Sequence, residues 1–104
     1  MKSLQEIQEQ CARGEIEFSD HALLRMRTRK ITSTEILEAL SVAEVLERYP
    51  DDKYGASMLV LGFTVSGRPL HIQVTAYHRK TVKVITGYEP DEEQWIHYRE
   101  RKKQ

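Results

Sequence analysis

The chain has 104 residues, of which 39% are hydrophobic and 31% are charged, and its formal net charge is zero. This length suits one domain with a single core, so we expect residues 1–104 to form one domain with a well-solvated surface. Zero net charge argues against a nucleic-acid binder that depends on strong overall basicity. The single cysteine, Cys11, excludes an internal disulfide and lies on the apolar stripe of a predicted helix, which favours a buried thiol.

The first residues, MKSLQEIQEQ, lack the apolar run that a signal peptide needs. No segment approaches the roughly 20 apolar residues of a membrane span. We therefore expect a soluble, cytoplasmic protein that does not enter a membrane.

Capping motifs predict the first and third helices of the chain. Ser3 and Glu6 form a capping box, in which each side chain satisfies the backbone amide of the other, and Gly14 supplies the left-handed residue that ends the helix. A second box, Thr32 with Glu35, begins another helix whose apolar positions follow the helical period.

The segment FSDHALLRMRTRKI, residues 18–31, predicts a cationic helix between these two. Ser19 is its expected N-cap, and the helix ends near residue 30. His21, Arg25 and Arg29 recur every four residues, so they share one face. A cationic ridge with an imidazole at its end suits a phosphodiester, and it equally suits a solvated helix surface.

Four later segments have the apolar pattern of strands, namely residues 45–49, 57–65, 69–77 and 81–88, whereas residues 15–18 form a short extended connector. In residues 69–77 the apolar side chains point one way, and His71, Gln73, Thr75 and Tyr77 point the other way. Turns at YPDDKYG and VSGR join successive strands. This pattern predicts an antiparallel meander whose polar side faces solvent.

Pro90 and Asp91 should end the last strand and cap a short terminal helix that carries Trp95 and Tyr98, followed by a frayed basic tail at residues 99–104. Helices followed by hairpins predict an α+β fold. We expect the N-terminal helices to pack on one face of an antiparallel meander sheet of about four strands, with a short C-terminal helix.

Charge is unevenly distributed along the chain. Residues 20–30 and 68–83 are basic, whereas the stretch between them is rich in acids. Separate patches would let the protein bind RNA on one side and a basic partner on the other, unless folding merely scatters these charges.

Motifs of several enzyme classes are absent from the sequence. The four histidines are scattered with no pair at i, i+4, and there is no CxxC, so we expect no metal site and no cofactor. GxGxxG, P-loop and GxSxG sequences are also missing, which disfavours nucleotide enzymes and serine hydrolases.

Three blocks, FSDHALLRMRTRKIT, YPDDKYGASMLVLG, and GRPLHIQV followed by VITGYEPD, together resemble the bacterial domain of unknown function 4258. The resemblance covers about residues 16–95. That family is related in topology to the RelE and BrnT toxins, small ribonuclease-fold proteins of toxin–antitoxin operons. The resemblance therefore implies a RelE/BrnT-like fold.

The resemblance implies five site residues and a chemistry. His21, Arg25 and Arg29 match the helix motif of the family, His71 its third-strand histidine, and Tyr88 its last-strand tyrosine. The implied reaction is metal-independent cleavage of messenger RNA, free or on the ribosome, by attack of the 2′-OH on the adjacent phosphate. One histidine would transfer protons, the arginines would hold the phosphate, and the tyrosine would donate a hydrogen bond or stack on a base. A cognate antitoxin would be the protein partner.

The chain departs from the family pattern at two points, and the first favours an alternative, a non-catalytic RNA- or protein-binding module on a toxin-like fold. The last strand, VITGYEP, lacks the arginines of BrnT-like chains, and Gly87 stands where a β-branched residue is expected, which indicates a bulge or the close approach of a substrate. Each candidate also has a structural interpretation. His21 would hold its helix to a loop, and Arg25 and Arg29 would form ion pairs with Glu35 or Glu38. His71 would be an exposed strand residue, and Tyr88 would pack on Trp95.

Overall fold

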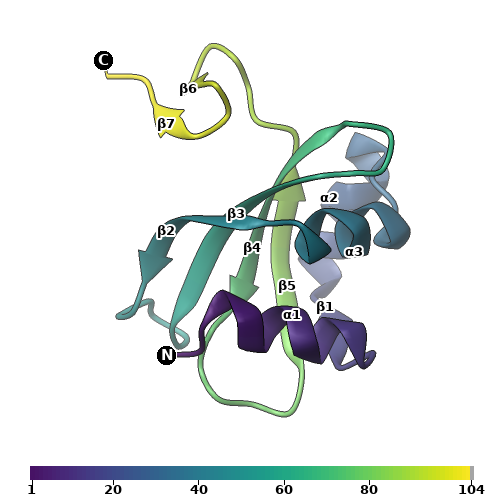
Figure 1. Ribbon diagram of the computed structural model, residues 1–104, viewed down its shortest axis with the longest axis vertical. Helices are drawn as coiled ribbons and strands as arrows, with labels where there is room; N and C mark the ends of the chain where they lie inside the picture. Colours follow the sequence, from purple (N-terminus) through teal and green to yellow (C-terminus); the bar gives the residue numbers. More distant parts are fainter. Residues whose placement is uncertain (104) are drawn as a thin grey trace.

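The computed structural model describes residues 1–103, and its centre is a five-stranded sheet with the order β1-β5-β4-β3-β2 (Figure 1). The strands are β1 (Ile16–Phe18), β2 (Glu44–Tyr49), β3 (Ser57–Phe63), β4 (Pro69–Thr75) and β5 (Val82–Tyr88). β1 lies parallel to β5, and the other neighbours are antiparallel. The four predicted strands are confirmed. The expected connector at residues 15–18 is instead a fifth strand, which makes the sheet mixed rather than a pure meander.

Three helices begin where the capping residues predict: α1 (Leu4–Ala12), α2 (Asp20–Arg29) and α3 (Ser33–Ser41). The hydroxyls of Ser3, Ser19 and Thr32 each accept the backbone N–H three residues along, and Thr32 and Glu35 complete a reciprocal box. Figure 1 shows α1 crossing in front of the strands. In residues 1–103, no helix combines the length and the apolar character that crossing a membrane requires.

The core lies between the helices and one face of the sheet, as the α+β prediction requires. Apolar side chains of all three helices join one cluster with those of the strands, including Ile7, Met26, Ile36, Leu40, Val60, Ile72 and Val84. Cys11 is part of this cluster, and burial raises the pKa of its thiol to about 11. The prediction of a buried cysteine is therefore confirmed.

The second face of the sheet carries His71, Gln73 and Thr75, and we call it the polar face. Cross-strand partners share a face, so Leu61, which pairs with His71, and Leu59, which pairs with Gln73, also stand on it. The predicted alternation in residues 69–77 is confirmed, because the intervening apolar side chains of β4 lie in the helix-covered core.

The chain ends in a hairpin, and the predicted terminal helix is wrong. After a single turn at Asp91, β6 (Trp95–Ile96) pairs antiparallel with β7 (Glu100–Arg101), so part of the expected frayed tail is a strand. Gln104, the last residue of that tail, lies outside the described residues. We call residues 95–101 the C-terminal hairpin. Burial of the Trp95 ring against His71 outweighs the helical tendency of the segment.

Candidate active site

His71 and Tyr88 lie together beneath the C-terminal hairpin. β4 and β5 pair the two residues directly, so both side chains stand on the polar face. His71 Nδ1 is 3.3 Å from the Tyr88 hydroxyl, and His71 Nε2 is 2.6 Å from the carbonyl oxygen of Tyr98. The Trp95 ring lies edge-on to the imidazole, with 4.4 Å between ring centroids. His71 is fully buried, so the hairpin covers the part of the polar face around His71, which the sequence predicted to be open.

The partners of His71 determine its tautomer. A carbonyl oxygen can only accept a hydrogen bond, so Nε2 carries the proton and donates a hydrogen bond to the carbonyl oxygen of Tyr98. Nδ1 is then unprotonated and accepts a hydrogen bond from the hydroxyl of Tyr88. Burial lowers the pKa of His71 and raises that of Tyr88, so both groups are held neutral. In this state both ring nitrogens of the imidazole are occupied.

Arg29 joins this pair from the edge of the sheet. β1 pairs with β5 only as far as Val84, so the outer edge of β5 beyond it has no strand neighbour. The Ser19 hydroxyl donates to the carbonyl of Ile85 there, and Arg29 Nη1 donates to the carbonyl of Gly87 at 2.9 Å. The Arg29 guanidinium then lies 5.8 Å from the centroid of the Tyr88 ring.

Arg68 fixes the end of α2 that carries Arg29. Its guanidinium donates to the carbonyl oxygens of Arg29 and Lys30 and forms ion pairs with Glu35 and Glu89. The last carbonyls of a helix have no partners within the helix, so these bonds satisfy groups that would otherwise rely on water.

His21 and Arg25 are on the same ridge as Arg29, but both side chains are exposed. Within residues 1–103, neither makes a hydrogen bond or ion pair, and the suggested pairing of Arg25 and Arg29 with Glu35 or Glu38 does not occur. The structure thus brings together Arg29, His71 and Tyr88 and leaves the other two candidates at the surface.

A Cβ added at Gly87 would point into the core and not toward the polar face. A Cβ added there would lie 3.0 Å from Ile36 Cδ1, so the residue leaves room for α3 in the core. The register shift of the β4–β5 pair falls at Ile85, because Gln73 pairs with Thr86 and Val74 with Val84. The expectation of a bulge at Gly87 is therefore wrong, because the bulge lies at Ile85.

Residues that the sequence did not identify as part of the site hold the hairpin in place. Arg99 forms an ion pair with Glu44, and Arg101 donates to both carboxylate oxygens of Glu47, at 2.9 and 3.1 Å. The Arg101 guanidinium also lies 4.6 Å from the centroid of Trp95, and its hydrogen bonds lower the pKa of Glu47. Only the basic composition of the tail signalled this role.

The chemistry available at the cluster is that of an imidazole, a phenol and a guanidinium. In the part of the chain that the structure describes, no three metal-ligating side chains converge. The cluster can therefore accept or donate a proton at His71 or Tyr88 and bind an anion at Arg29.

Comparisons with known proteins match this domain to one family. No curated protein and no solved structure matches the chain. Residues 18–89 match the family described as "Domain of unknown function (DUF4258)". This span contains all five candidate residues, and the C-terminal hairpin lies beyond it. Because the match covers more than half of the sequence, the chain belongs to the DUF4258 family.

Proposed function

We propose that the chain is a metal-independent endoribonuclease that cleaves messenger RNA, of the kind that acts as the toxin of a bacterial toxin–antitoxin module. The observation that carries this proposal is the continuous set of contacts from Arg29 to Tyr88 to His71. These contacts unite a cation, a phenol and an imidazole on one face of the sheet. The relation to the RelE and BrnT toxins, which the sequence resemblance implies, belongs to the same proposal, as does a cognate antitoxin as the protein partner.

Attack of a ribose 2′-OH on the adjacent phosphate needs a proton acceptor, a donor for the leaving 5′-oxygen and positive charge near the phosphate. His71 can accept the 2′-OH proton at Nδ1 and return it to the leaving 5′-oxygen, and Tyr88 can donate a hydrogen bond to the reacting groups. Arg29 uses one nitrogen on the Gly87 carbonyl and retains further N–H donors for phosphate oxygens. His21 and Arg25 extend the cationic ridge for neighbouring phosphates.

The hairpin must move for this chemistry to occur, because it covers His71 and excludes a substrate from the imidazole. Arg99 and Arg101 hold it through the carboxylates of Glu44, which is exposed, and Glu47, which is partly exposed, and RNA phosphates compete for the same guanidinium groups. We therefore propose that the structure is the closed state and that RNA draws the hairpin away from β2.

Primer extension on a message translated in a bacterial cell-free system tests the proposal. The wild-type chain should produce discrete cuts, and Tyr88→Phe, which removes only the hydroxyl, should slow them at least about tenfold. Arg25→Ala should weaken cleavage, whereas Arg27→Ala, an exposed arginine elsewhere on the same helix, should not. An intact message with the wild-type chain would overturn the proposal.

One observation favours a second candidate, the non-catalytic RNA- or protein-binding module. Both nitrogens of His71 are engaged in the closed state, as expected of a histidine that holds the hairpin to the sheet. In that case RNA or a protein partner would bind without being cut, and Tyr88→Phe would change stability but not function. Binding without cleavage is the result that selects this candidate.

A further inference from the structure

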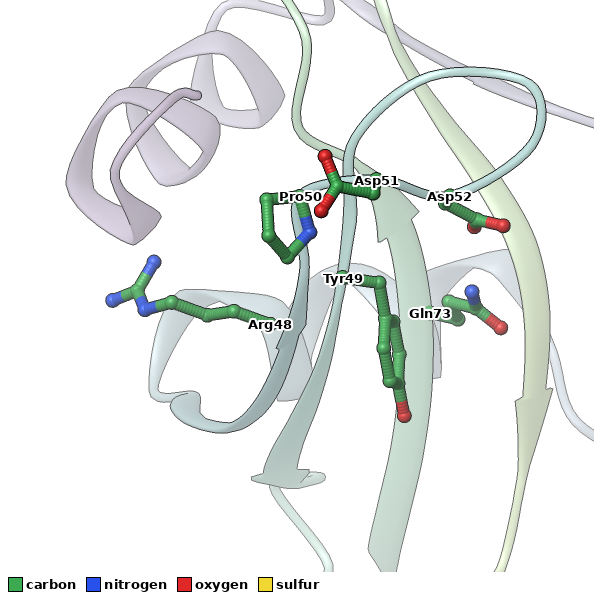
Figure 2. Close-up of a pocket in the computed structure, with 6 residues that line it drawn as sticks. All are labelled: Arg48, Tyr49, Pro50, Asp51, Asp52 and Gln73. Carbon is green, nitrogen blue, oxygen red and sulfur yellow. The ribbon is translucent and has the colours of Figure 1, made fainter.

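We infer that the half of the polar face that the hairpin leaves uncovered is a groove for single-stranded RNA, and this inference rests on the proposed action on RNA. Two cavities adjoin there, one of about 530 Å³ beside Tyr49 and one of about 430 Å³ beside Lys83. Asp52 and Gln73 line both cavities, so the two adjoin, and together we call them the sheet groove. Figure 2 shows its β2 end, where Arg48 extends away from the other labelled side chains.

Aromatic side chains line the groove from the loops after β2 and β4. Tyr54 is 82% exposed, with the Lys53 ammonium 5.2 Å from its ring centroid. Tyr77 packs on the backbone of Gly55, where an added Cβ would lie 2.4 Å from the ring. An exposed aromatic ring beside a cation, above a groove, is the arrangement on which unpaired bases stack.

Two cations form the wall of the groove beside Tyr77. Arg79 and Lys83 lie 3.5 and 3.6 Å from the carboxylate of Glu17, and the Arg79 guanidinium also donates to the Tyr77 hydroxyl. These long, part-exposed ion pairs are weak, so a phosphate can displace Glu17. The basic segment of residues 68–83 that the sequence singles out thus places Arg79 and Lys83 on this wall.

The floor presents hydrogen-bond acceptors. Ser57 donates to the Asp52 carboxylate at 2.8 Å, so its oxygen must accept from the Gln73 amide nitrogen, which is 3.1 Å away. These hydrogen bonds fix the orientation of the Gln73 amide. Its carbonyl oxygen and the Asp52 carboxylate can then accept hydrogen bonds from base N–H groups. In a nucleotide the base and the phosphate lie apart, so the acceptors on the floor can bind the base while the cations on the wall bind the phosphate.

The groove also leads to the candidate site. Gln73 follows His71 by two residues on β4, so both face the same side of the sheet. An RNA strand bound in the groove would therefore continue beneath the C-terminal hairpin toward His71.

Fluorescence anisotropy with a labelled single-stranded RNA of about ten nucleotides tests the inference on the full chain. Tyr54→Ala should weaken binding about tenfold, and Arg79→Gln with Lys83→Gln should weaken it at least as much and reduce its salt dependence. The matched control is Arg13→Gln with Lys103→Gln, two exposed cations that do not line the groove. Circular dichroism verifies that every variant is folded.

Equal binding by all variants, no binding by the wild type, or equal binding of duplex RNA would overturn the inference. Its failure is separable from that of the proposed function. Groove variants that lose RNA while the wild type leaves messages intact would support the groove and refute the nuclease. Cleavage that persists unchanged in the groove variants would support the nuclease and refute the groove.

Discussion

At the scale of single residues, His71 makes the stability of the fold depend on pH. Burial lowers its pKa below the ordinary 6.5, so below that pH the unfolded chain takes up a proton before the folded chain does. The stabilisation is therefore complete above pH 6.5 and is lost as the pH falls toward the folded-state pKa. The free energy of unfolding should decrease across this window.

Urea unfolding followed by the fluorescence of Trp95, the single tryptophan, measures this decrease. Between about pH 7.5 and pH 5, the midpoint should fall for the wild type and stay nearly flat for His71→Gln. Glu35 and Glu47 do not interfere, since hydrogen bonds lower their pKa values from 4.5 and place their titration below this range. Parallel slopes for the two proteins would show that His71 is not the titrating group.

At the scale of secondary-structure elements, Gly62 sets how closely α3 approaches β3. A Cβ added at Gly62 would lie 1.9 Å from the backbone oxygen of Ala39, which cannot move without displacing the helix. Gly62→Ala should therefore cost roughly 3 kcal/mol, at the upper end of overpacking. Gly87→Ala is the matched control, because its Cβ would meet only the flexible end of Ile36. Equal unfolding free energies for the two variants would contradict this account.

Local patterns predicted the elements that local interactions determine. The Ser3 and Thr32 caps and the alternation around Ile72 depend on residues a few positions apart, so the sequence contains their signals. β1 escaped detection because its three residues are a strand only through parallel pairing with β5, more than 60 residues away.

The C-terminal hairpin escaped detection for a related reason. Its turn places His97 and Tyr98 at φ of 51° and 65°, which tight hairpins normally assign to glycine or asparagine. The contacts of Trp95 and Arg101 with the sheet hold this turn, and no local pattern reports them.

The candidate site was partly predictable on the same grounds. Helical spacing placed Arg29 on the ridge, and strand alternation placed His71 on the polar face. Their meeting through Tyr88 depends on the β4–β5 register and on the end of β1, which are long-range properties. The prediction that His71 is exposed to solvent was wrong, because the alternation of a strand does not reveal what covers the sheet.

At the scale of the whole molecule, the fold pairs some of the opposite charges whose equal numbers give the sequence zero net charge. The acidic stretch after α3 suggested a basic partner, and the chain itself provides one. Glu44 and Glu47 of β2 bind Arg99 and Arg101 of the C-terminal hairpin. Pairing these charges covers the part of the polar face around His71, so the balance between internal carboxylates and external phosphates would determine whether His71 is accessible.

This balance predicts that weakening the β2 side of the pairs opens the hairpin. Glu44→Gln with Glu47→Gln retains both arginines, and it should shift Trp95 emission to the red, increase its quenching by acrylamide and accelerate RNA cleavage several-fold. Glu92→Gln with Glu93→Gln is the control, because it changes the net charge equally at exposed sites that form no ion pair within residues 1–103. Equal cleavage by the two double variants would attribute any gain to net charge alone. An exposed Trp95 without faster cleavage would show that the hairpin does not limit access to His71.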